Sequence, residues 1–332
     1  MMFAKFLKNV TICFLLSCTC FLSAVFIQMN APTESSRWIY EINQAKSNLA
    51  HSINEPKLIV LSGSNSLFGM SCKTIQEDIQ IPCVNAATNA GLGLDYILSF
   101  GRSLARPGDT FLLPLEYGMY QYDGKHSDVL IDYIFARDPG YLNKIGFESR
   151  MRAIGGISFS RLMRGTIYKV AKISPRKDGY QSDTLNEYGD ETRNTVASIT
   201  EAHRQKLNRL QPMEKINGSV DSSHGMQSIR DFVRWCRDNN IQVLASWPST
   251  VWFEAYNQPS RREYFKSIKN FYQSLDIPIL GQPQDFMYDV SLFYDTAYHL
   301  NDRGMHQRTE QVISLLQPYL QPNEKLTQVT KK

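Results

Sequence analysis

The chain lacks a strong excess of charge of either sign. Its 332 residues include 36 Lys and Arg against 32 Asp and Glu, which gives a formal net charge of +4 at pH 7. The acids and bases are interspersed, whereas nucleic-acid-binding proteins gather basic residues on one face or in one run. Cysteine and histidine are scarce, with six of each, and none has the spacing of a zinc site. We therefore expect no nucleic-acid partner, no metal and no other cofactor.

One uncharged, mostly apolar run extends from Val10 to Ile27. At about 18 residues it matches a transmembrane helix and exceeds a typical signal-peptide core. Lys5 and Lys8 precede it, so the positive-inside rule keeps the N-terminus in the cytoplasm. The rest of the chain would then lie on the periplasmic or cell-surface side. An uncleaved single-pass anchor is our leading interpretation, and the alternatives are a cleaved signal peptide or a lipoprotein modified at Cys18.

The sequence predicts four parts. Residues 1–29 form the anchor or signal segment, residues 30–56 a polar tether, residues 57–322 an α/β domain, and residues 323–332 a polar tail. Within the domain, the stretch at about 120–220 is rich in charged, glycine and other polar residues and has only brief helical pieces. Such a length is unusual for a connection in an α/β fold, so we expect an insertion on the sheet. The insertion either caps the site or docks on a partner.

Apolar strand-like runs alternate with amphipathic helical stretches from Leu58 onward, which is typical of a parallel α/β sheet. We expect a three-layer α/β domain with a five-stranded parallel sheet. The predicted strands lie at Leu58–Leu61, Ile81–Val84, Thr110–Leu115, Ile241–Ser246 and Ile277–Leu280. The predicted helices lie at Cys72–Ile79, Leu94–Leu104, Met226–Asn239, Ser267–Leu275 and Gln307–Leu320.

Two of the six cysteines form a candidate pair. Cys72 and Cys83 lie on either side of one short segment, whereas three others lie in the apolar run and Cys236 stands alone. An exported domain meets an oxidising compartment, in which a disulfide would join the pair. The alternative is two independent buried thiols.

Nearly every candidate functional side chain follows a predicted strand. These residues are Ser64 after the first strand, Asn85 and Asn89 after the second, Glu116 and Tyr117 after the third, Trp247 after the fourth, and Asp285, Asp295 and His299 beyond the fifth. Open parallel sheets bind ligands at the carboxyl ends of their strands. We therefore expect these residues to line one edge of the sheet. Aromatic rings at this edge suit stacking on sugar faces, or alternatively pack the insertion onto the sheet.

Ser64 is the predicted nucleophile, because a serine on a strand-to-helix turn, served by a distant Asp/His pair, is the arrangement of acyl-transfer chemistry. In this interpretation His299 takes the serine proton and Asp295 orients the imidazole. We expect Ser64 and His299 to approach within about 4 Å, since nucleophile and base must lie near hydrogen-bonding reach. Free N–H groups at the start of the next helix would stabilise an oxyanion. Asp285 is the alternative acid, and Ser66 is the alternative nucleophile.

Three further residues are expected near the oxyanion. Asn85 or Asn89 would donate a hydrogen bond to it, although asparagines also serve turns by bonding their own backbone. Glu116 is the awkward member, because an ionised carboxylate facing an oxyanion costs several kcal/mol in a dry site. Glu116 therefore points away, pairs with an arginine, or indicates chemistry other than ordinary ester hydrolysis.

These blocks resemble the SGNH (GDSL-type) hydrolase superfamily, in its membrane-anchored, exported branch related to polysaccharide and cell-wall O-acylation. The resemblance covers roughly residues 56–120 and 226–320. Ser62-Gly63-Ser64 stands where the family has Gly-Asp-Ser, so Ser64 matches the family's nucleophile. An alanine occupies the position of the second block's glycine, and Glu116 replaces the third block's asparagine. The last block, Asp-x-x-His in the family, is one residue longer at Asp295–His299.

The resemblance implies a flavodoxin-like fold and an exported serine esterase or O-acyltransferase that acts on acyl groups of envelope or extracellular polysaccharide. An acyl-enzyme on Ser64 would pass its acyl group to water or to a sugar hydroxyl. The alternative is a catalytically impaired SGNH-like domain that binds glycan or assists a membrane acyltransferase. The departures at Glu116 and in the second block favour this alternative. A purely structural envelope protein is a third hypothesis.

Overall fold

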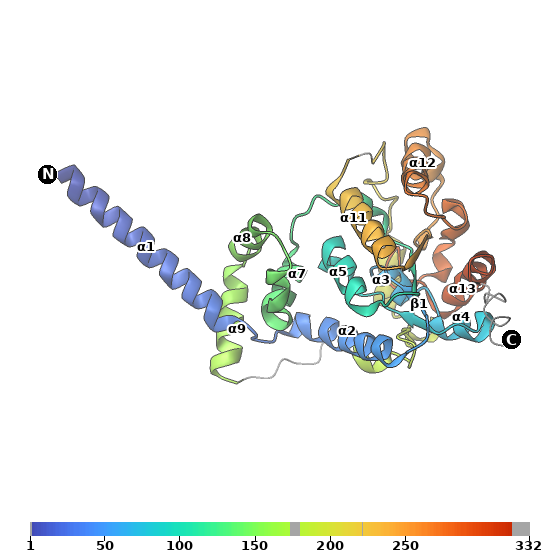
Figure 1. The fold of residues 1–332 in the computed structure, drawn as a ribbon, viewed down its shortest axis with the longest axis horizontal. Helices are drawn as coiled ribbons and strands as arrows, with labels where there is room; N and C mark the ends of the chain where they lie inside the picture. The colour runs from blue at the N-terminus through green and yellow to red at the C-terminus, as the bar shows by residue number, and fades with distance from the viewer. Residues whose placement is uncertain (1, 173–179, 221, 321–332) are drawn as a thin grey trace, which may run out of the picture. The chain divides into compact units, whose positions relative to one another are not determined.

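The computed structural model describes residues 2–172, 180–220 and 222–320 (Figure 1). The fold is mixed α/β and mostly helical, with a parallel sheet of four strands. The polar tail predicted at 323–332 lies outside the described residues.

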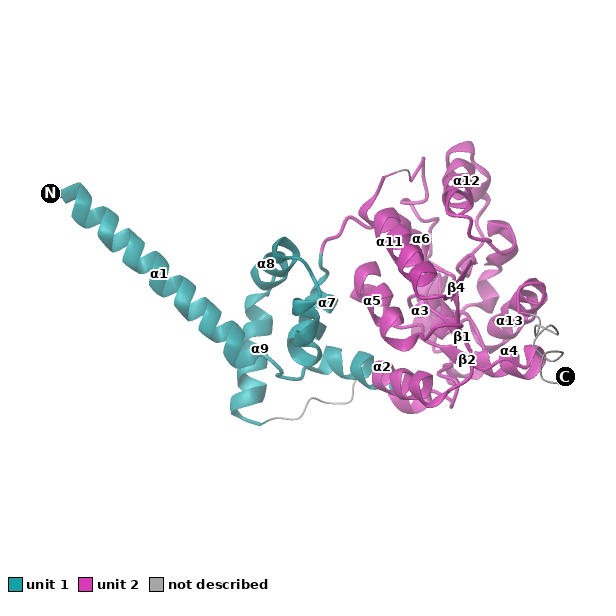
Figure 2. Ribbon diagram, in the orientation of Figure 1, with its two compact units in different colours: residues 1–41, 126–181 teal, residues 42–125, 182–332 magenta. Residues whose placement is uncertain are grey.

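The contacts within the chain divide it into two compact units (Figure 2). Unit 1 comprises residues 1–41 and 126–181, and unit 2 comprises residues 42–125 and 182–332. The stretch predicted as one insertion, at about 120–220, is therefore shared between the two units.

Unit 1 is helical in the residues that the structure describes. Its elements are α1 (Met2–Gln28), the first part of α2 (Glu34–Ser52), α7 (Asp128–Arg137), a 3-10 helix (Pro139–Asn143), α8 (Phe147–Gly155) and α9 (Phe159–Val170). Helix α1 is long and apolar enough to cross a membrane, and most of its side chains are exposed. The apolar run of the sequence thus forms one continuous helix.

The segment predicted as a polar tether contains helix α2. This helix begins in unit 1 and ends in unit 2. Its Ile39, Ile42 and Ala50 side chains are buried, whereas a tether would leave them in water. The polar residues of the segment form the outer faces of an amphipathic helix, which the prediction of a polar tether did not include.

A four-stranded parallel sheet forms the centre of unit 2. Its strands are β1 (Leu58–Val60), β2 (Cys83–Asn85), β3 (Thr110–Leu113) and β4 (Gln242–Ala245), in the order β2-β1-β3-β4. Every residue of β1 and β3 is buried. Strands covered on both faces need apolar side chains at successive positions, which is why they read as continuous apolar runs. Because all three pairings are parallel, the carboxyl ends of the strands meet at one edge, as predicted.

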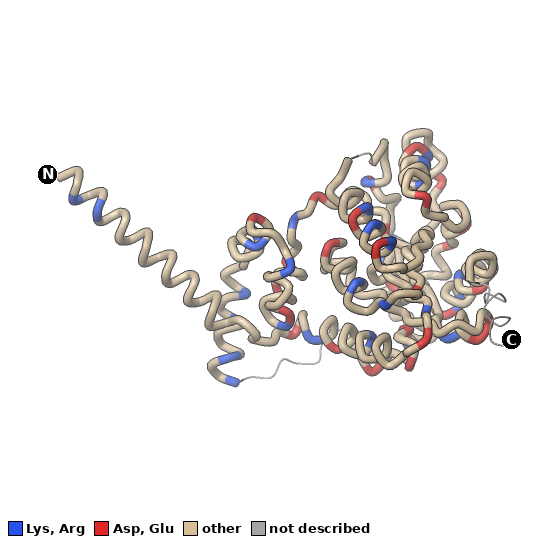
Figure 3. The backbone as a smooth tube through the Cα atoms, viewed as in Figure 1, with Lys and Arg blue, Asp and Glu red and all other residues tan. Residues whose placement is uncertain are grey.

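Helices pack on both sides of this sheet. Helix α5 (Leu94–Leu104) packs against α11 (His224–Asp238), and α4 (Cys72–Ile79) packs against α13 (Asp302–Leu316). Figure 2 shows the first pair on one side of the strands and the second pair on the other. Charges of both signs are spread over unit 2 (Figure 3).

The remaining elements of unit 2 are short apart from α12. They are α3 (Ser64–Leu67), α6 (Tyr117–Tyr120), α10 (Glu201–Leu207), α12 (Pro259–Ser274), and the parallel pair β5 (Thr250–Val251) and β6 (Met287–Tyr288). Single 3-10 turns lie at Ala90–Leu92, Ser182–Thr184, Val196–Ser198, Glu254–Asn257, Pro283–Phe286 and Val290–Leu292.

The prediction of a fifth strand at Ile277–Leu280 is wrong. This segment forms only an isolated parallel bridge between Ile279 and Ala245 at the end of β4. Pro278 has no N–H to donate to a ladder, so it contributes only its carbonyl, which accepts from the Ala245 N–H. Gly281 follows with a φ of 69° and turns the chain away from the sheet.

A disulfide joins Cys72, at the start of α4, to Cys83, at the start of β2. Of the two alternatives from the sequence, the disulfide is therefore the one present. It fixes a helix to the sheet edge strand across a sequence separation of 11 residues.

Removing this disulfide should destabilise the fold. For a closed loop of this length the loss is about 3 kcal/mol, because the unfolded chain regains the freedom that the link removes. The melting temperature of full-length protein in detergent micelles should fall in a Cys72→Ala/Cys83→Ala variant. The exposed Cys13 supplies a control substitution, Cys13→Ala. Equal melting of both variants and the wild type would contradict the expectation.

Lys46 of α2 is a buried cation that contacts the chain after β2. Its ammonium donates a hydrogen bond to the carbonyl of Ala87. Burial lowers the pKa of Lys46 from 10.5 to about 7, against the attraction of Asp190 and Glu191. Between these two pH values the unfolded chain binds more protons than the folded one. The free energy of unfolding contributed by this group therefore rises with pH across that window.

The wild-type protein should thus gain thermal stability between pH 7 and pH 9 relative to a Lys46→Met variant, because the variant has no ammonium to bury. Melting curves at several pH values measure the difference. Lys73→Met, at an exposed position of α4, is the matched control and should follow the wild type. A Lys46→Met curve parallel to the wild type would refute the role of Lys46.

Candidate active site

Ser64, His299 and Asp295 form a continuous hydrogen-bonded relay in unit 2. The Ser64 Oγ lies 2.8 Å from His299 Nε2, and His299 Nδ1 lies 2.7 Å from Asp295 Oδ1. His299 and Asp295 are buried, and Ser64 is partly exposed. The predicted approach of serine and histidine is confirmed, with the acid on the far side of the imidazole. The alternative acid, Asp285, instead accepts from the N–H of Gln282 at a 3-10 helix start.

A compact turn explains how the lengthened Asp295–His299 spacing still brings acid and imidazole together. Phe293 and Leu300 form an antiparallel bridge across its base. The Tyr294 N–H donates to the His299 carbonyl at 2.7 Å, and the hydroxyl of Thr296 accepts from the His299 N–H at 3.1 Å. The extra residue is absorbed in this closed turn.

The plane of the His299 ring is fixed by aromatic packing. Phe68, immediately after α3, stacks on it with ring centroids 4.2 Å apart and planes 15° apart. Tyr294 stacks on Phe68 in turn, at 6.2 Å between centroids. Stacked rings resist rotation of the imidazole about its side-chain bonds, so Nε2 stays aimed at Ser64.

Glu116 binds the backbone of the turn that carries Ser64. Its carboxylate accepts from the Gly63 N–H and from the Asn65 N–H, each at 3.0 Å. A Cβ at position 63 would lie 2.4 Å from Glu116 Oε1, so only glycine allows this close approach. The sequence interpretation expected free N–H groups around Ser64. The N–H groups on both sides of Ser64 are instead occupied by a buried carboxylate.

Arg308, which the sequence interpretation missed, holds the same turn from the other side. Its guanidinium donates to the Asn65 carbonyl at 3.2 Å, to Asn65 Oδ1 at 3.1 Å and to the Trp247 carbonyl at 3.1 Å. The side chain is fully buried, which lowers its pKa to about 10, so the guanidinium stays charged at neutral pH. The spacing of the sequence indicates that Arg308 is buried. Arg308 stands four positions from Gly304 and from Val312, on the buried stripe of α13.

Asn85 does not face the relay, contrary to expectation. Its amide NH₂ donates to the carbonyls of Ser66 and Met70 and to Asp190 Oδ1, at 3.0 to 3.1 Å. Its Oδ1 accepts from the Ala87 N–H at 3.2 Å. The Asn85 side chain therefore connects β2 to the segment that follows Ser64. Its amide hydrogens are bound to these acceptors and are not available to an oxyanion.

Asn89 and Trp247 also have structural contacts at the sheet edge. The Asn89 side chain caps a 3-10 turn by accepting from the Gly91 N–H at 2.7 Å. Trp247 is fully buried and donates from Nε1 to the Gly281 carbonyl at 3.2 Å. Its ring packs on Tyr117 and Phe265 within the core. Trp247 is therefore a core residue and not a sugar-stacking surface.

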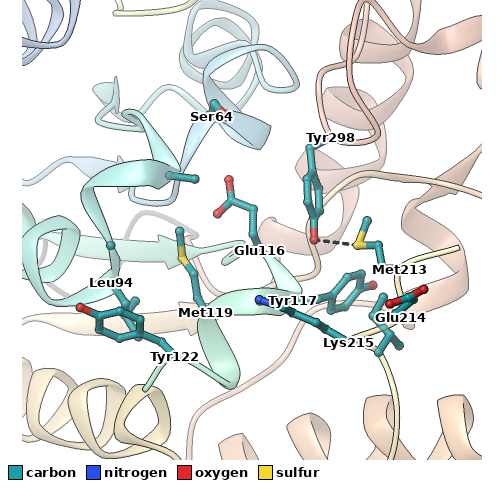
Figure 4. Close-up of a pocket in the computed structure, with 14 residues that line it drawn as sticks. Ser64, Leu94, Glu116, Tyr117, Met119, Tyr122, Met213, Glu214, Lys215 and Tyr298 are labelled. Carbon is teal, nitrogen blue, oxygen red and sulfur yellow. Dashed lines mark hydrogen bonds between the residues drawn. The ribbon is translucent and has the colours of Figure 1, made fainter. Parts of the chain in front are cut away.

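A pocket of about 520 Å³ opens beside Ser64. Figure 4 shows the Glu116 side chain between Ser64 and Met119, with Tyr298 and Met213 on the opposite wall. Most of the lining is apolar or aromatic, and the lining residues are Ser64, Ala90, Gly93, Leu94, Glu116, Tyr117, Gly118, Met119, Tyr122, Met213, Glu214, Lys215, Ile216 and Tyr298. Residues 213–216 belong to the stretch predicted as an insertion. That part of the stretch forms one wall of the pocket.

Two aromatic residues, Tyr117 and Trp247, were predicted at the site, and of these Tyr117 lines the pocket. Its ring packs on Phe265 at 5.3 Å between centroids, and burial raises its pKa well above the usual value. Its hydroxyl is buried and has no hydrogen-bond partner within the described part of the chain.

No family model matches this chain, and no curated protein matches it. Within residues 2–172, 180–220 and 222–320, no group of three or more His, Cys, Asp or Glu side chains is placed to hold a metal ion.

Replacing Glu116 should destabilise the Ser64 turn. A Glu116→Ala variant leaves the Gly63 and Asn65 N–H groups without their acceptor, at a cost of about 1–3 kcal/mol for each buried donor. Thermal melting of the full-length protein in detergent micelles measures the loss. Glu214→Ala is the matched control, since Glu214 lines the same pocket but is exposed. Equal melting temperatures for the two variants would contradict a stabilising role of the Glu116 hydrogen bonds.

Proposed function

We propose that unit 2 is an exported SGNH-type acyl-transfer domain, a serine esterase or O-acyltransferase that acts on acyl groups of envelope or extracellular polysaccharide. The observation that carries the proposal is the Ser64–His299–Asp295 relay, with contacts of 2.8 and 2.7 Å, beside an apolar pocket. The sheet order β2-β1-β3-β4 supports a flavodoxin-like assignment, in which ligands bind at the carboxyl ends of the strands.

The relay can form and break an acyl-enzyme. Ser64 Oγ attacks the ester carbonyl carbon while its proton passes to His299 Nε2, and Asp295 holds the opposite ring nitrogen and stabilises the imidazolium. His299 then gives the proton to the leaving alcohol oxygen as the ester C–O bond breaks. In the second half, His299 takes a proton from water or from a sugar hydroxyl, whose oxygen attacks the acyl-Ser64 carbonyl. The bond between the acyl carbon and Ser64 Oγ then breaks, and His299 returns the proton to Oγ. Hydrolysis and transfer differ only in that acceptor.

The pocket fits the two parts of such a substrate. Its walls at Leu94, Met119 and Ile216 are apolar and suit an acyl group. The rings of Tyr117 and Tyr298 combine an apolar face with a hydroxyl, which suits a sugar. The acyl carbonyl would lie at Ser64, where the two regions meet.

The N-terminal helix and the disulfide support the proposed compartment. Helix α1 would act as a single-pass anchor, with unit 2 on the periplasmic or cell-surface side. The Cys72–Cys83 disulfide supports an oxidising compartment for unit 2.

A second candidate function is a catalytically impaired SGNH-like domain that binds acylated glycan or assists a membrane acyltransferase. Its specific support is Glu116, whose carboxylate occupies the N–H groups of Gly63 and Asn65 on either side of Ser64. An ionised carboxylate beside a developing oxyanion raises the barrier to acyl transfer. The two candidates differ in whether the site turns over.

Full-length protein in detergent micelles should hydrolyse para-nitrophenyl acetate or butyrate. A Ser64→Ala variant should lose about 10⁴-fold or more in kcat, because the nucleophile acts as a unit with its base. Ser103→Ala, at an exposed position of α5, is the control and should retain the wild-type rate. Release of nitrophenolate is followed by absorbance.

Two outcomes would count against the catalytic proposal. Wild-type turnover no faster than that of Ser64→Ala would favour the binding or accessory function. Turnover retained in Ser64→Ala but lost in Ser66→Ala would move the nucleophile to the alternative serine.

A further inference from the structure

Helix α9 in unit 1 leaves an apolar face in water. Its exposed residues Phe159, Met163, Ile167 and Val170 are spaced so that they share one face of the helix. Between 46% and 77% of each side chain's surface is exposed. Soluble proteins rarely leave a contiguous stripe of large apolar side chains uncovered, so this face indicates an interaction surface.

Helix α8 presents a second set of the same kind. Phe147 and Met151 lie one turn apart on it and are 75% and 41% exposed. The two helices follow each other in the chain, with α8 ending at Gly155 and α9 beginning at Phe159. Their six exposed apolar residues are called the α8–α9 face below.

The opposite face of α9 holds the end of helix α1. Arg161 donates to the Ala31 carbonyl at 3.2 Å, and Lys169 donates to the Met29 carbonyl at 2.8 Å. Gly165 lies so close to Gln28 that an added Cβ would be 3.0 Å from the Gln28 Cβ. Helix α9 therefore packs at the point where the apolar run of α1 ends. A helix fixed at the end of a membrane span lies at the level of the membrane surface.

The charges on α8 and α9 are mainly basic, and the one acid on these two helices, Glu148, is ion-paired with Arg152 at 2.7 Å. Between residues 149 and 172 the chain has six Lys or Arg residues and no Asp or Glu. Figure 3 shows Lys and Arg on α8 and α9. Of these, Arg152, Arg164 and Lys169 are exposed. An amphipathic helix with an apolar face and basic flanks is the pattern of helices that lie in the interface of an anionic bilayer.

We propose that the α8–α9 face rests on the bilayer that α1 spans, with its apolar side chains among the upper acyl chains and its basic side chains at anionic headgroups. The proposal uses α1 as the anchor and does not depend on acyl chemistry at Ser64. A protein partner would also cover apolar side chains. The position of α9 at the end of α1, together with the exposed basic residues Arg164 and Lys169 and the absence of acids on α9, favours lipid.

Depth-dependent fluorescence quenching in vesicles tests the proposal. Full-length Met163→Trp protein is reconstituted into vesicles of phosphatidylcholine and phosphatidylglycerol, with and without lipids brominated near the top of the acyl chains. The wild type supplies the signal of its native tryptophans. Val290→Trp, at an exposed apolar position of unit 2, is the matched control. Both substitutions are at exposed positions, so neither disturbs the core.

The expected result is a blue-shifted emission for Met163→Trp and a loss of intensity with brominated lipid, beyond that of the wild type. Val290→Trp should add no quenching. Quenching of Met163→Trp should weaken in vesicles of phosphatidylcholine alone, because the headgroup attraction is lost.

Three results would overturn the proposal. Unquenched Met163→Trp in vesicles that contain the protein would assign the face to a protein partner. Equal quenching of Met163→Trp and Val290→Trp would show no preference for α8 and α9. Protein that fails to float with the vesicles would remove the anchor on which the proposal rests. None of these results depends on esterase turnover, so they are separable from a failure of the acyl-transfer function.

Discussion

The turn that carries Ser64 is held between two buried charges of opposite sign. Glu116 binds its N–H groups from the end of β3, and Arg308 binds the Asn65 carbonyl and side chain from α13. The relay depends on this clamp, because a nucleophile must stay within hydrogen-bonding reach of its base. The cost of burying each charge is offset by several directed hydrogen bonds, which also fix the backbone in one conformation.

The contacts of Glu116 have two opposing effects on the site. A carboxylate that positions the Ser64 backbone also occupies donors that an oxyanion would use. If Ser64 catalyses acyl transfer, the pocket must stabilise the oxyanion beside Glu116. If it does not, the same geometry suits a domain that holds an acylated glycan. The relay and the apolar pocket beside it are present in both cases.

The sequence predicted the parts that local pattern determines. Runs of apolar residues located the four strands, and parallel topology then placed Ser64 and Glu116 at one edge. What it could not predict depended on distant segments. Asn85 is turned away from the relay by Asp190, from the stretch predicted as an insertion. The two hydrogen bonds of Glu116 to the Ser64 turn require the ends of β1 and β3 to be adjacent. Unit 1 is assembled from residues 1–41 and 126–181, two stretches that are distant in the sequence.

The most direct measurement of the central claim is covalent labelling of full-length protein by a fluorophosphonate, with the modified residue located by mass spectrometry. A serine activated by a histidine–carboxylate pair displaces the fluoride, whereas turn serines stay unmodified. We expect a single adduct on Ser64, lost in Ser64→Ala and strongly reduced in His299→Ala. An unlabelled protein, or an adduct that persists on another residue in Ser64→Ala, would contradict Ser64 as an activated nucleophile.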